Sequence, residues 1–283
     1  MIFFKLLSYL PFSVLYILSD ALAFTAYRII RYRKKVVLMN LRNSFPDAPE
    51  NEIIKIAKDF YRNLADIIVE TMKALTLSPE KLKKRVHFRN VEIVQAYYDN
   101  KQSIIVMATR TGNWEWMLLS GSLQLPYPID GVYAPLANAF YEKLMYQLRS
   151  RFGSMPIPRP DILKELSKRS KLLRATGLVA DQTPTKNAEK HWVKFLHQDT
   201  AFLKGADMLA KMTRYPVIFL SLRRIKRGYY EVSIEKIAEP PYEKNSTHIL
   251  DTYIQKSEQL IRENPAAWLW SHRRWKLKKS VYA

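Results

Sequence analysis

Apolar and polar positions divide the chain into a first part that is helical throughout and a longer part in which strands and helices alternate. Between residues 40 and 75, apolar side chains recur at every third or fourth position, which predicts an amphipathic helix that covers the core. Residues 47–50 supply an acidic helix start directly after the turn at Pro46. This part of the chain should therefore pack against the rest through one face.

From residue 86 onward, short apolar runs alternate with helical patterns. A turn at residues 226–228, which contains Gly228, joins the last two runs and predicts a hairpin, whereas the polar residues 183–191 predict a loop. Strands that alternate with helices predict an α/β fold with a mixed, mostly parallel central sheet flanked by helices. We expect strands at 86–88, 103–108, 129–133, 177–180, 217–224 and 229–234, and helices at 91–100, 114–123, 138–152, 201–213 and 247–263.

Residues 6–27 are strongly apolar and hold a single formal charge, at Asp20. At about 1.5 Å per residue, a helix of this length just crosses a bilayer core of about 30 Å, and a helix lying in the membrane interface would suit Asp20 and Pro11 equally well. A buried helix of a soluble domain is the alternative. We therefore divide the chain into a membrane anchor or interfacial helix over residues 1–30 and an α/β domain over residues 31–283.

The charges on either side of this apolar segment are asymmetric. Only Lys5 precedes it, whereas a basic cluster follows it, made of Arg28, Arg31, Arg33, Lys34 and Lys35. Because the cytoplasmic flanks of membrane helices are rich in Lys and Arg, the α/β domain is expected at the inner membrane, on its cytoplasmic side. The same cluster would attract anionic lipid headgroups.

The composition narrows the possible chemistry. A chain of 283 residues, 48% of them apolar, can fill a substantial core. Cysteine is absent, which excludes disulfides, thiolate metal sites and cysteine nucleophiles. The five histidines show no zinc-ligand spacing with a supporting acid, so we expect no metal and no cofactor.

The formal net charge is +20, from 46 Lys and Arg residues against 26 Asp and Glu residues. Such an excess implies a negatively charged partner, which could be nucleic acid, an anionic membrane surface or an acidic carrier protein. The basic residues are dispersed and no groove-reading motif is present, which disfavours nucleic acid.

The stretch from Ala108 to Trp116 carries the clearest candidate chemistry. It follows an apolar strand, and Glu115 stands where a helix should begin, a position at which a carboxylate gains from the helix dipole. Gly112 and Asn113 suit a tight turn whose backbone amides face a developing oxyanion. Taken alone, Glu115 would be an ordinary acid in the first turn of a helix.

This stretch resembles the catalytic turn of the late acyltransferases of lipid A biosynthesis, in the glycerolipid-acyltransferase-like superfamily, which commonly reads His-x-Gly-Asn-Trp-Glu. Three further stretches are similar to the same family in the same order: residues 33–46, Asp181-Gln182 with residues 195–205, and residues 268–275. The resemblance implies a membrane-associated enzyme that moves a fatty acyl chain from acyl-carrier protein or acyl-CoA. The acceptor would be a hydroxyl or amine of a lipid similar to a lipid A precursor.

The resemblance places Arg110 at the position of the family histidine, which is thought to act as the general base. Arginine stays protonated and offers only donors, so Arg110 could hold a phosphate, a carboxylate or Glu115 but could not accept a proton. Two interpretations stay open: an active acyltransferase, and a catalytically inert relative that binds lipid or carrier. The implied site residues are Glu115 and Arg110 as catalytic positions, Gly112 and Asn113 at the turn, and Arg149, Asp181 and Gln182 in substrate binding.

Some of these residue types also suit structural roles. Arg149 stands at a predicted helix end, where a cation complements the dipole without binding any substrate. Tryptophans at alternate positions near the C-terminus fit either an interfacial belt or the core, and these are Trp268, Trp270 and Trp275. The histidines that could replace the missing base are His191, His197 and His272.

Overall fold

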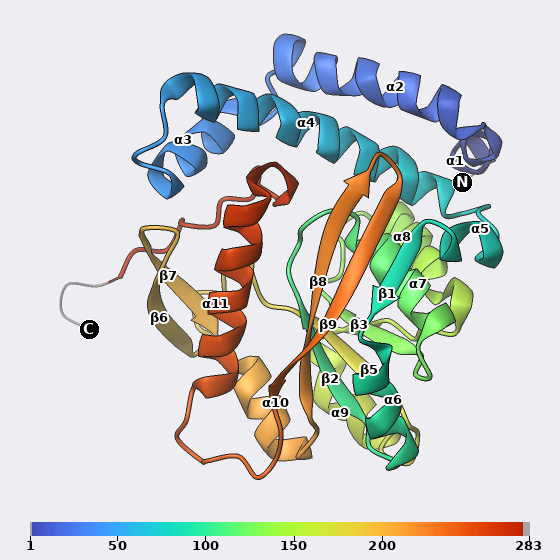
Figure 1. Cartoon of the computed structure of the whole chain (residues 1–283), viewed down its shortest axis with the longest axis vertical. Coiled ribbons are helices and arrows are strands. Elements are labelled where there is room, and N and C mark those ends of the chain that lie inside the picture. Colours follow the sequence, from blue (N-terminus) through green and yellow to red (C-terminus); the bar gives the residue numbers. More distant parts are fainter. Residues whose placement is uncertain (1, 280–283) are drawn as a thin grey trace.

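The computed structural model describes residues 2–279 and has a seven-stranded sheet at its centre (Figure 1). Strands β8, β2, β5, β3 and β4 run parallel, whereas β9 is antiparallel to β8 and β1 is parallel to β9. The predicted mixed, mostly parallel α/β fold is confirmed. In sheet order the strands are β1 (Val86–Arg89), β9 (Tyr229–Ala238), β8 (Val217–Lys226), β2 (Ile104–Ala108), β5 (Ala175–Val179), β3 (Ile129–Tyr133) and β4 (Ile157–Pro158).

Helices cover both faces of the sheet because its central strands are apolar on both sides. All five residues of β2 are buried, and successive side chains point to opposite faces. Ile105 and Met107 join the core beneath α10 and α11, whereas Ile104 and Val106 join the core beneath α6 and α7. These helices are α6 (Val91–Asp99), α7 (Trp114–Gln124), α8 (Ala139–Arg149), α9 (Ile162–Lys168), α10 (Gly205–Thr213) and α11 (His248–Glu263).

The helical pattern predicted between residues 40 and 75 belongs to two helices. Helix α3 (Lys34–Ser44) ends before the turn at Pro46, and α4 (Glu50–Lys73) begins in the acidic stretch. Figure 1 shows α4 lying across the end of the sheet to which β8 points, which is where the parallel strands end. Loops that leave those strands therefore lie beneath α4. The remaining helices of the described chain are α1 (Ile2–Tyr9), α2 (Phe12–Phe24), the π-helical turn Thr25–Ile29, α5 (Pro79–Lys83) and three short 3-10 turns at Ser150–Phe152, Arg159–Asp161 and Pro265–Ala267.

The region around residue 195 departs from the prediction. The predicted loop over 183–191 ends at residue 189, and the helix predicted over 201–213 begins only at Gly205, as α10. Between them the chain forms the hairpin of β6 (Lys190–Phe195) and β7 (Gln198–Leu203), which was not predicted. Its two turn residues, Leu196 and His197, have positive φ angles of 49° and 63°. Tight hairpins require that conformation, but neither residue type signals it, because Asn and Gly are the usual occupants. The β8–β9 hairpin at Gly228 (φ 73°) is confirmed.

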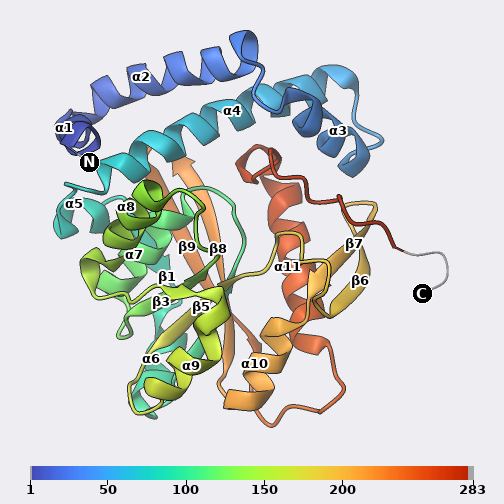
Figure 2. The same cartoon turned by 180° about the vertical axis from the view of Figure 1, so that it is seen from behind.

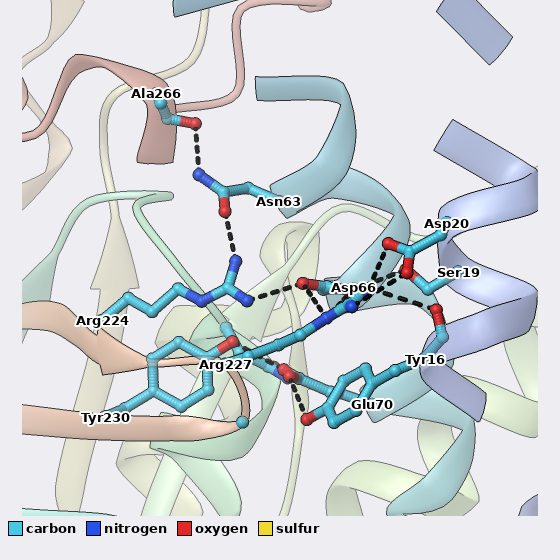
Figure 3. Close-up of polar contacts among 12 residues, drawn as sticks. Tyr16, Ser19, Asp20, Asn63, Asp66, Glu70, Arg224, Arg227, Tyr230 and Ala266 are labelled. Atoms are coloured by element: carbon cyan, nitrogen blue, oxygen red, sulfur yellow. Dashed lines mark hydrogen bonds and ion pairs between the residues drawn. The ribbon is translucent and has the colours of Figure 1, made fainter. Parts of the chain in front are cut away.

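The N-terminal helix α2 lies along the outer side of α4, as both views show (Figures 1 and 2). Its inner face is tied down by polar contacts (Figure 3). Ser19 Oγ donates to Asp66 of α4 at 2.6 Å, and Asp20 pairs with Arg227 of the hairpin at 2.6 Å. The division of the chain at residue 30 stays a prediction; Met1 and residues 280–283 lie outside the described residues.

The outer face of the same helix is apolar. Residues 12–29 form a helix that is long and apolar enough, by length and composition, to cross a membrane, and 22% of this segment is buried. The large apolar side chains exposed on it include Val14, Ile17, Leu18, Leu22, Phe24 and Ile29. One face of this segment is therefore bound to the protein, and the other is free for a second apolar partner.

Candidate active site

The turn between β2 and α7 is built by Gly112 and Asn113. Gly112 has a φ of 57°, and a Cβ atom added to it would lie 3.1 Å from Leu222 Cδ2, so both backbone and packing favour glycine. Asn113 is the N-cap of α7, because its Oδ1 accepts from the backbone N–H of Trp116 at 3.0 Å. This cap places Glu115 in the first turn of α7.

The donors of this turn are already engaged. The backbone N–H of Gly112 donates to the carbonyl of Ala267 at 3.1 Å, and Asn113 Nδ2 donates to Glu70 at 2.9 Å. The predicted role of the Gly112 amide as an oxyanion donor therefore needs correction: in this structure that amide holds the C-terminal segment. An oxyanion role for the Asn113 backbone amide stays a prediction.

Glu70 of α4 is a central residue that the sequence analysis missed. Its carboxylate is fully buried and accepts from Tyr16 at 3.0 Å, Asn113 at 2.9 Å and Tyr230 at 2.6 Å. Burial raises the pKa of Glu70, and the hydrogen bonds from Tyr230 and Asn113 oppose that rise. The sequence does contain a signal for its burial, because Glu70 stands three residues after Ile67, on the apolar face of the predicted helix.

Glu115 is buried and forms a two-pronged ion pair with Arg149 of α8. The Nε and Nη2 atoms of Arg149 donate to Glu115 at 2.9 and 2.5 Å, and Trp114 Nε1 donates to it at 3.2 Å. The guanidinium of Arg149 also lies 5.2 Å from the ring centre of Tyr133. The structure thus brings together two of the predicted site residues, 34 positions apart in the sequence.

Arg110 does not face Glu115. Its Nη1 donates to Asp181 at 3.3 Å and its backbone N–H donates to the same carboxylate at 2.9 Å. Asp181 is buried and also accepts from Trp268 Nε1 at 2.8 Å. The possibility that Arg110 holds Glu115 is therefore wrong for this structure. Gln182 follows Asp181 and is half-buried.

A narrow apolar cavity is lined at its polar end by the Glu115–Arg149 pair and by Arg110. It holds about 80 Å³ and admits a short segment of hydrocarbon in this conformation. Among the described residues that line it, Glu115 is the one carboxylate and none is a histidine. Its polar lining is Arg110, Glu115, Arg149, Trp114 and Tyr133, and its apolar lining comes mainly from β2, β3, β5 and α7, with Val106, Met117, Leu118, Ile129, Val132, Leu178, Val179 and Leu220.

The three candidate histidines lie outside this cavity. His191 Nε2 is 2.7 Å from Asp251, and His197 is in the β6–β7 turn. His272 lines a separate apolar groove beside α2 and α4. Burial lowers the pKa of His272 to about 4, with Asp181 acting in the opposite direction. The structure therefore brings no replacement base to Glu115 from these three positions.

The C-terminal tryptophans belong mainly to the core. Trp268 and Trp270 are buried, with ring centres 4.8 Å apart, so the interfacial belt is wrong for these two. Trp275 is half-buried and donates to Thr200 at 2.7 Å. Asn40 Nδ2 donates to the carbonyl of Trp270 at 2.9 Å. The stretch over 33–46, the Asp181 segment and the stretch over 268–275 therefore meet at one place beside the turn between β2 and α7.

Comparison with known proteins decides the family. A family model described as bacterial lipid A biosynthesis acyltransferase matches residues 1–277. The chain belongs to this family. The resemblance that rests on the four sequence stretches is confirmed, and it extends over nearly the whole chain.

Individual relatives within the family are distant in sequence. The chain is 24% identical over 272 residues to the lipid A biosynthesis lauroyltransferase of Escherichia coli (strain K12), covering 95% of this chain and 87% of that protein. It is 26% identical over 258 residues to a lipid A biosynthesis acyltransferase of Haemophilus influenzae, covering 90% and 81%. The lipid A biosynthesis palmitoleoyltransferase of E. coli is 22% identical, with 95% and 87% covered.

Asn113 both caps α7 and donates to Glu70, and its contribution to stability can be compared with that of Asn138, which only caps a helix. Asn138 caps α8 by accepting from the backbone N–H of Phe140 at 3.0 Å and is exposed. We expect Asn138→Ala to cost about 1 kcal/mol of unfolding free energy. Asn113→Ala should cost about 2 to 4 kcal/mol, because it also removes a donor from buried Glu70. Urea unfolding of both variants tests this, and equal losses would show that the Glu70 contact adds nothing.

The depressed pKa of His272 makes stability depend on pH. Between pH 6.5 and about 4 the unfolded chain binds a proton at this side chain that the folded chain does not, so stability falls as the pH is lowered through that range. Wild type should lose about 1 to 2 kcal/mol more than His272→Gln over this interval, allowing for partial exposure. Parallel stability curves for the two proteins would contradict the assignment.

Proposed function

We propose that this protein transfers a fatty acyl group from an acyl thioester to a hydroxyl or amine of a lipid acceptor of the lipid A type. One observation carries the proposal: the Glu115–Arg149 pair lies buried at the mouth of an apolar cavity, at the carboxyl end of a parallel sheet. Ligand sites of open α/β sheets occur at that edge. The names of the relatives, which include a lauroyltransferase and a palmitoleoyltransferase, support an acyl chain as the transferred group.

The reaction needs one bond formed and one broken. The acceptor oxygen or nitrogen bonds to the acyl carbonyl carbon, the carbon–sulfur bond breaks, and the proton of the acceptor ends on the departing thiol. Negative charge develops on the carbonyl oxygen, and we expect the guanidinium groups of Arg149 and Arg110, which both line the cavity, to stabilise it. Because arginine cannot accept a proton, Glu115 or a water molecule must take it first.

We propose the class of acyl donor from the net charge of the protein. Acyl-carrier protein and acyl-CoA both present a thioester on a negatively charged carrier, and the net charge of +20 suits either one. Arg110 and Arg149 stand where the cavity opens, so a phosphate of the carrier arm is a further candidate partner for them.

Membrane attachment is proposed to run through the outer face of α2. The inner face of this helix is held by Asp66, Glu70 and Arg227, so lipid cannot surround the helix while these contacts persist. A helix with one docked face and one exposed apolar face suits the plane of the membrane interface. The basic cluster over residues 28–35 supports attachment to the anionic cytoplasmic side of the inner membrane.

An inert relative is the second candidate, and the Arg110–Asp181 pair favours it. A cation stands where the resemblance implies the general base, and its carboxylate partner holds it in place. Such a protein would bind an acyl lipid or carrier without turning it over.

A transfer assay separates the two candidates. With labelled acyl thioester and a lipid A precursor, we expect product from wild type and at least about a hundredfold less from Glu115→Gln, which loses the charge that aligns Arg149. Glu92→Gln, an exposed acid of α6, is the matched control. Product from Arg110→His alone would establish the inert candidate, and no loss in Glu115→Gln would remove the proposed centre.

The apolar face of α2 can be tested without disturbing its docked side. Ile17, Leu18 and Phe24 are 68%, 44% and 60% exposed, so replacing all three with serine should spare the fold. Co-sedimentation with vesicles should weaken at least tenfold, since each buried apolar side chain contributes about 1.5 to 3 kcal/mol. Serine at exposed Leu163 and Leu172 is the control, and unchanged sedimentation of the α2 variant would contradict interfacial attachment.

A further inference from the structure

A second, polar cavity of about 780 Å³ lies between α2, α4 and the β8–β9 hairpin. It shares no lining residue with the apolar cavity at Glu115. Figure 3 shows the side chains that converge beneath it from the three elements. The polar cavity is therefore a separate site from the apolar cavity at Glu115.

The floor of this cavity is built from two arginines and two aspartates. Asp66 is 2% exposed and accepts from Arg224 at 2.6 Å and from Arg227 at 2.7 Å. Asp20 of α2 pairs with Arg227 at 2.6 Å, and Asn63 accepts from Arg224. The charges of the floor balance, and both guanidinium groups are held in fixed orientations.

Some N–H groups of Arg224 make no hydrogen bond to the described protein and can donate to a ligand. Of its five N–H groups, one contacts Asn63 and one contacts Asp66, and its Nε has no hydrogen-bond partner within residues 2–279. A guanidinium that is fixed on one side and open on the other is suited to a phosphate, because its planar fork matches two phosphate oxygens.

The rim of the cavity carries unbalanced positive charge. Arg62 pairs with Asp59 at 3.2 Å. Arg28 contacts the ring of Tyr27 at 5.7 Å but no carboxylate of the described chain, and Lys58 has neither a hydrogen bond nor an ion pair there. The cavity as a whole therefore has two cations without a carboxylate partner, which suits a ligand with two negative charges.

The mouth of the cavity borders the apolar face of α2. Phe24 lines the cavity and is 60% exposed, and Ile17 and Leu18 continue the exposed face along the same helix. A lipid with its chains against this face would bring its headgroup to Arg28 and Lys58.

We propose that this cavity binds a phosphate group with two negative charges, carried by a membrane lipid whose chains lie along the outer face of α2. The floor arginine Arg224 would donate to the phosphate from below, and Arg28 and Lys58 would pair with it at the rim. Acyl transfer is not part of this proposal, so a protein inactive in the transfer assay would still be expected to bind the phosphate.

The test uses the full chain in dodecyl maltoside micelles at pH 8, where a phosphomonoester is dianionic because its second pKa is about 6. The melting temperature is followed while dioleoyl phosphatidic acid is added to the micelles, and dioleoyl phosphatidylcholine and inorganic phosphate are titrated separately. Binding to the folded state alone raises the melting temperature in proportion to site occupancy. Phosphatidic acid should stabilise the protein and phosphatidylcholine should not.

Variants distinguish binding in this cavity from a general attraction of the positively charged protein to anionic lipid. The double change Arg28→Ala with Lys58→Ala should raise the half-saturating amount of phosphatidic acid roughly thirtyfold, since each cation near a membrane surface adds about a fivefold gain in affinity. Lys58→Glu alone should also raise it, through repulsion. Lys164→Ala with Lys171→Ala removes the same charge from exposed positions elsewhere and should leave the titration unchanged.

Two results would overturn the proposal. If the control pair weakens the binding of phosphatidic acid as much as the cavity pair does, the protein responds to net charge. If phosphatidylcholine stabilises the protein as much as phosphatidic acid does, it responds to lipid in general and not to a phosphate in this cavity. If inorganic phosphate alone stabilises wild type as strongly as phosphatidic acid, and the cavity variant loses that response, the phosphate site stands but the lipid as its source is wrong.

Discussion

The carboxylate of Glu70 is the constraint on which the arrangement of the site depends. A buried carboxylate is costly unless donors surround it, and its donors come from three separate elements: Tyr16 of α2, Asn113 at the start of α7 and Tyr230 of β9. No one of these elements can move far without leaving the charge short of a donor. The N-terminal helix α2, the turn before α7 and the hairpin strand β9 therefore share one reference point on α4. Glu115 is two residues beyond Asn113, so its position is fixed through the same contact.

Two ion pairs divide the polar end of the site between them. Arg149 holds Glu115, and Asp181 holds Arg110 while also accepting from Trp268. The second pair ties the turn between β2 and α7 to the C-terminal segment, where the carbonyl of Ala267 also accepts from the Gly112 amide. A residue that cannot accept protons is thus part of the framework of the turn. Under the proposed function, acyl transfer at this centre would depend on the carboxylate of Glu115 and on the positive charge around it.

The sequence predicted the parts of the structure that depend on local pattern. The continuous apolar run of β2, the hairpin at Gly228 and the tight turn at Gly112 and Asn113 before a helix start follow from residue type and spacing. The β6–β7 hairpin was missed because its turn places Leu196 and His197 in a conformation that neither residue favours. Which arginine pairs with which acid depends on the distance between α7, α8 and the end of β5, and no linear spacing encodes that distance. The burial of Trp268 and Trp270 likewise reflects packing against distant residues.

The central claim is that an acyl chain enters the cavity behind Glu115 with its carbonyl at the two arginines. The most direct measurement is a crystal structure of the protein bound to a ketone analogue of the donor, in which a methylene group separates the carbonyl carbon from the sulfur. Such an analogue keeps the carbonyl but has no thioester bond that can break. We expect the hydrocarbon to lie among Val106, Leu118 and Val179, with the side chains around it displaced to widen the cavity, and the carbonyl oxygen within hydrogen-bond distance of Arg149 or Arg110. An analogue bound elsewhere, with the cavity still closed and the Glu115–Arg149 pair untouched by ligand, would contradict the account.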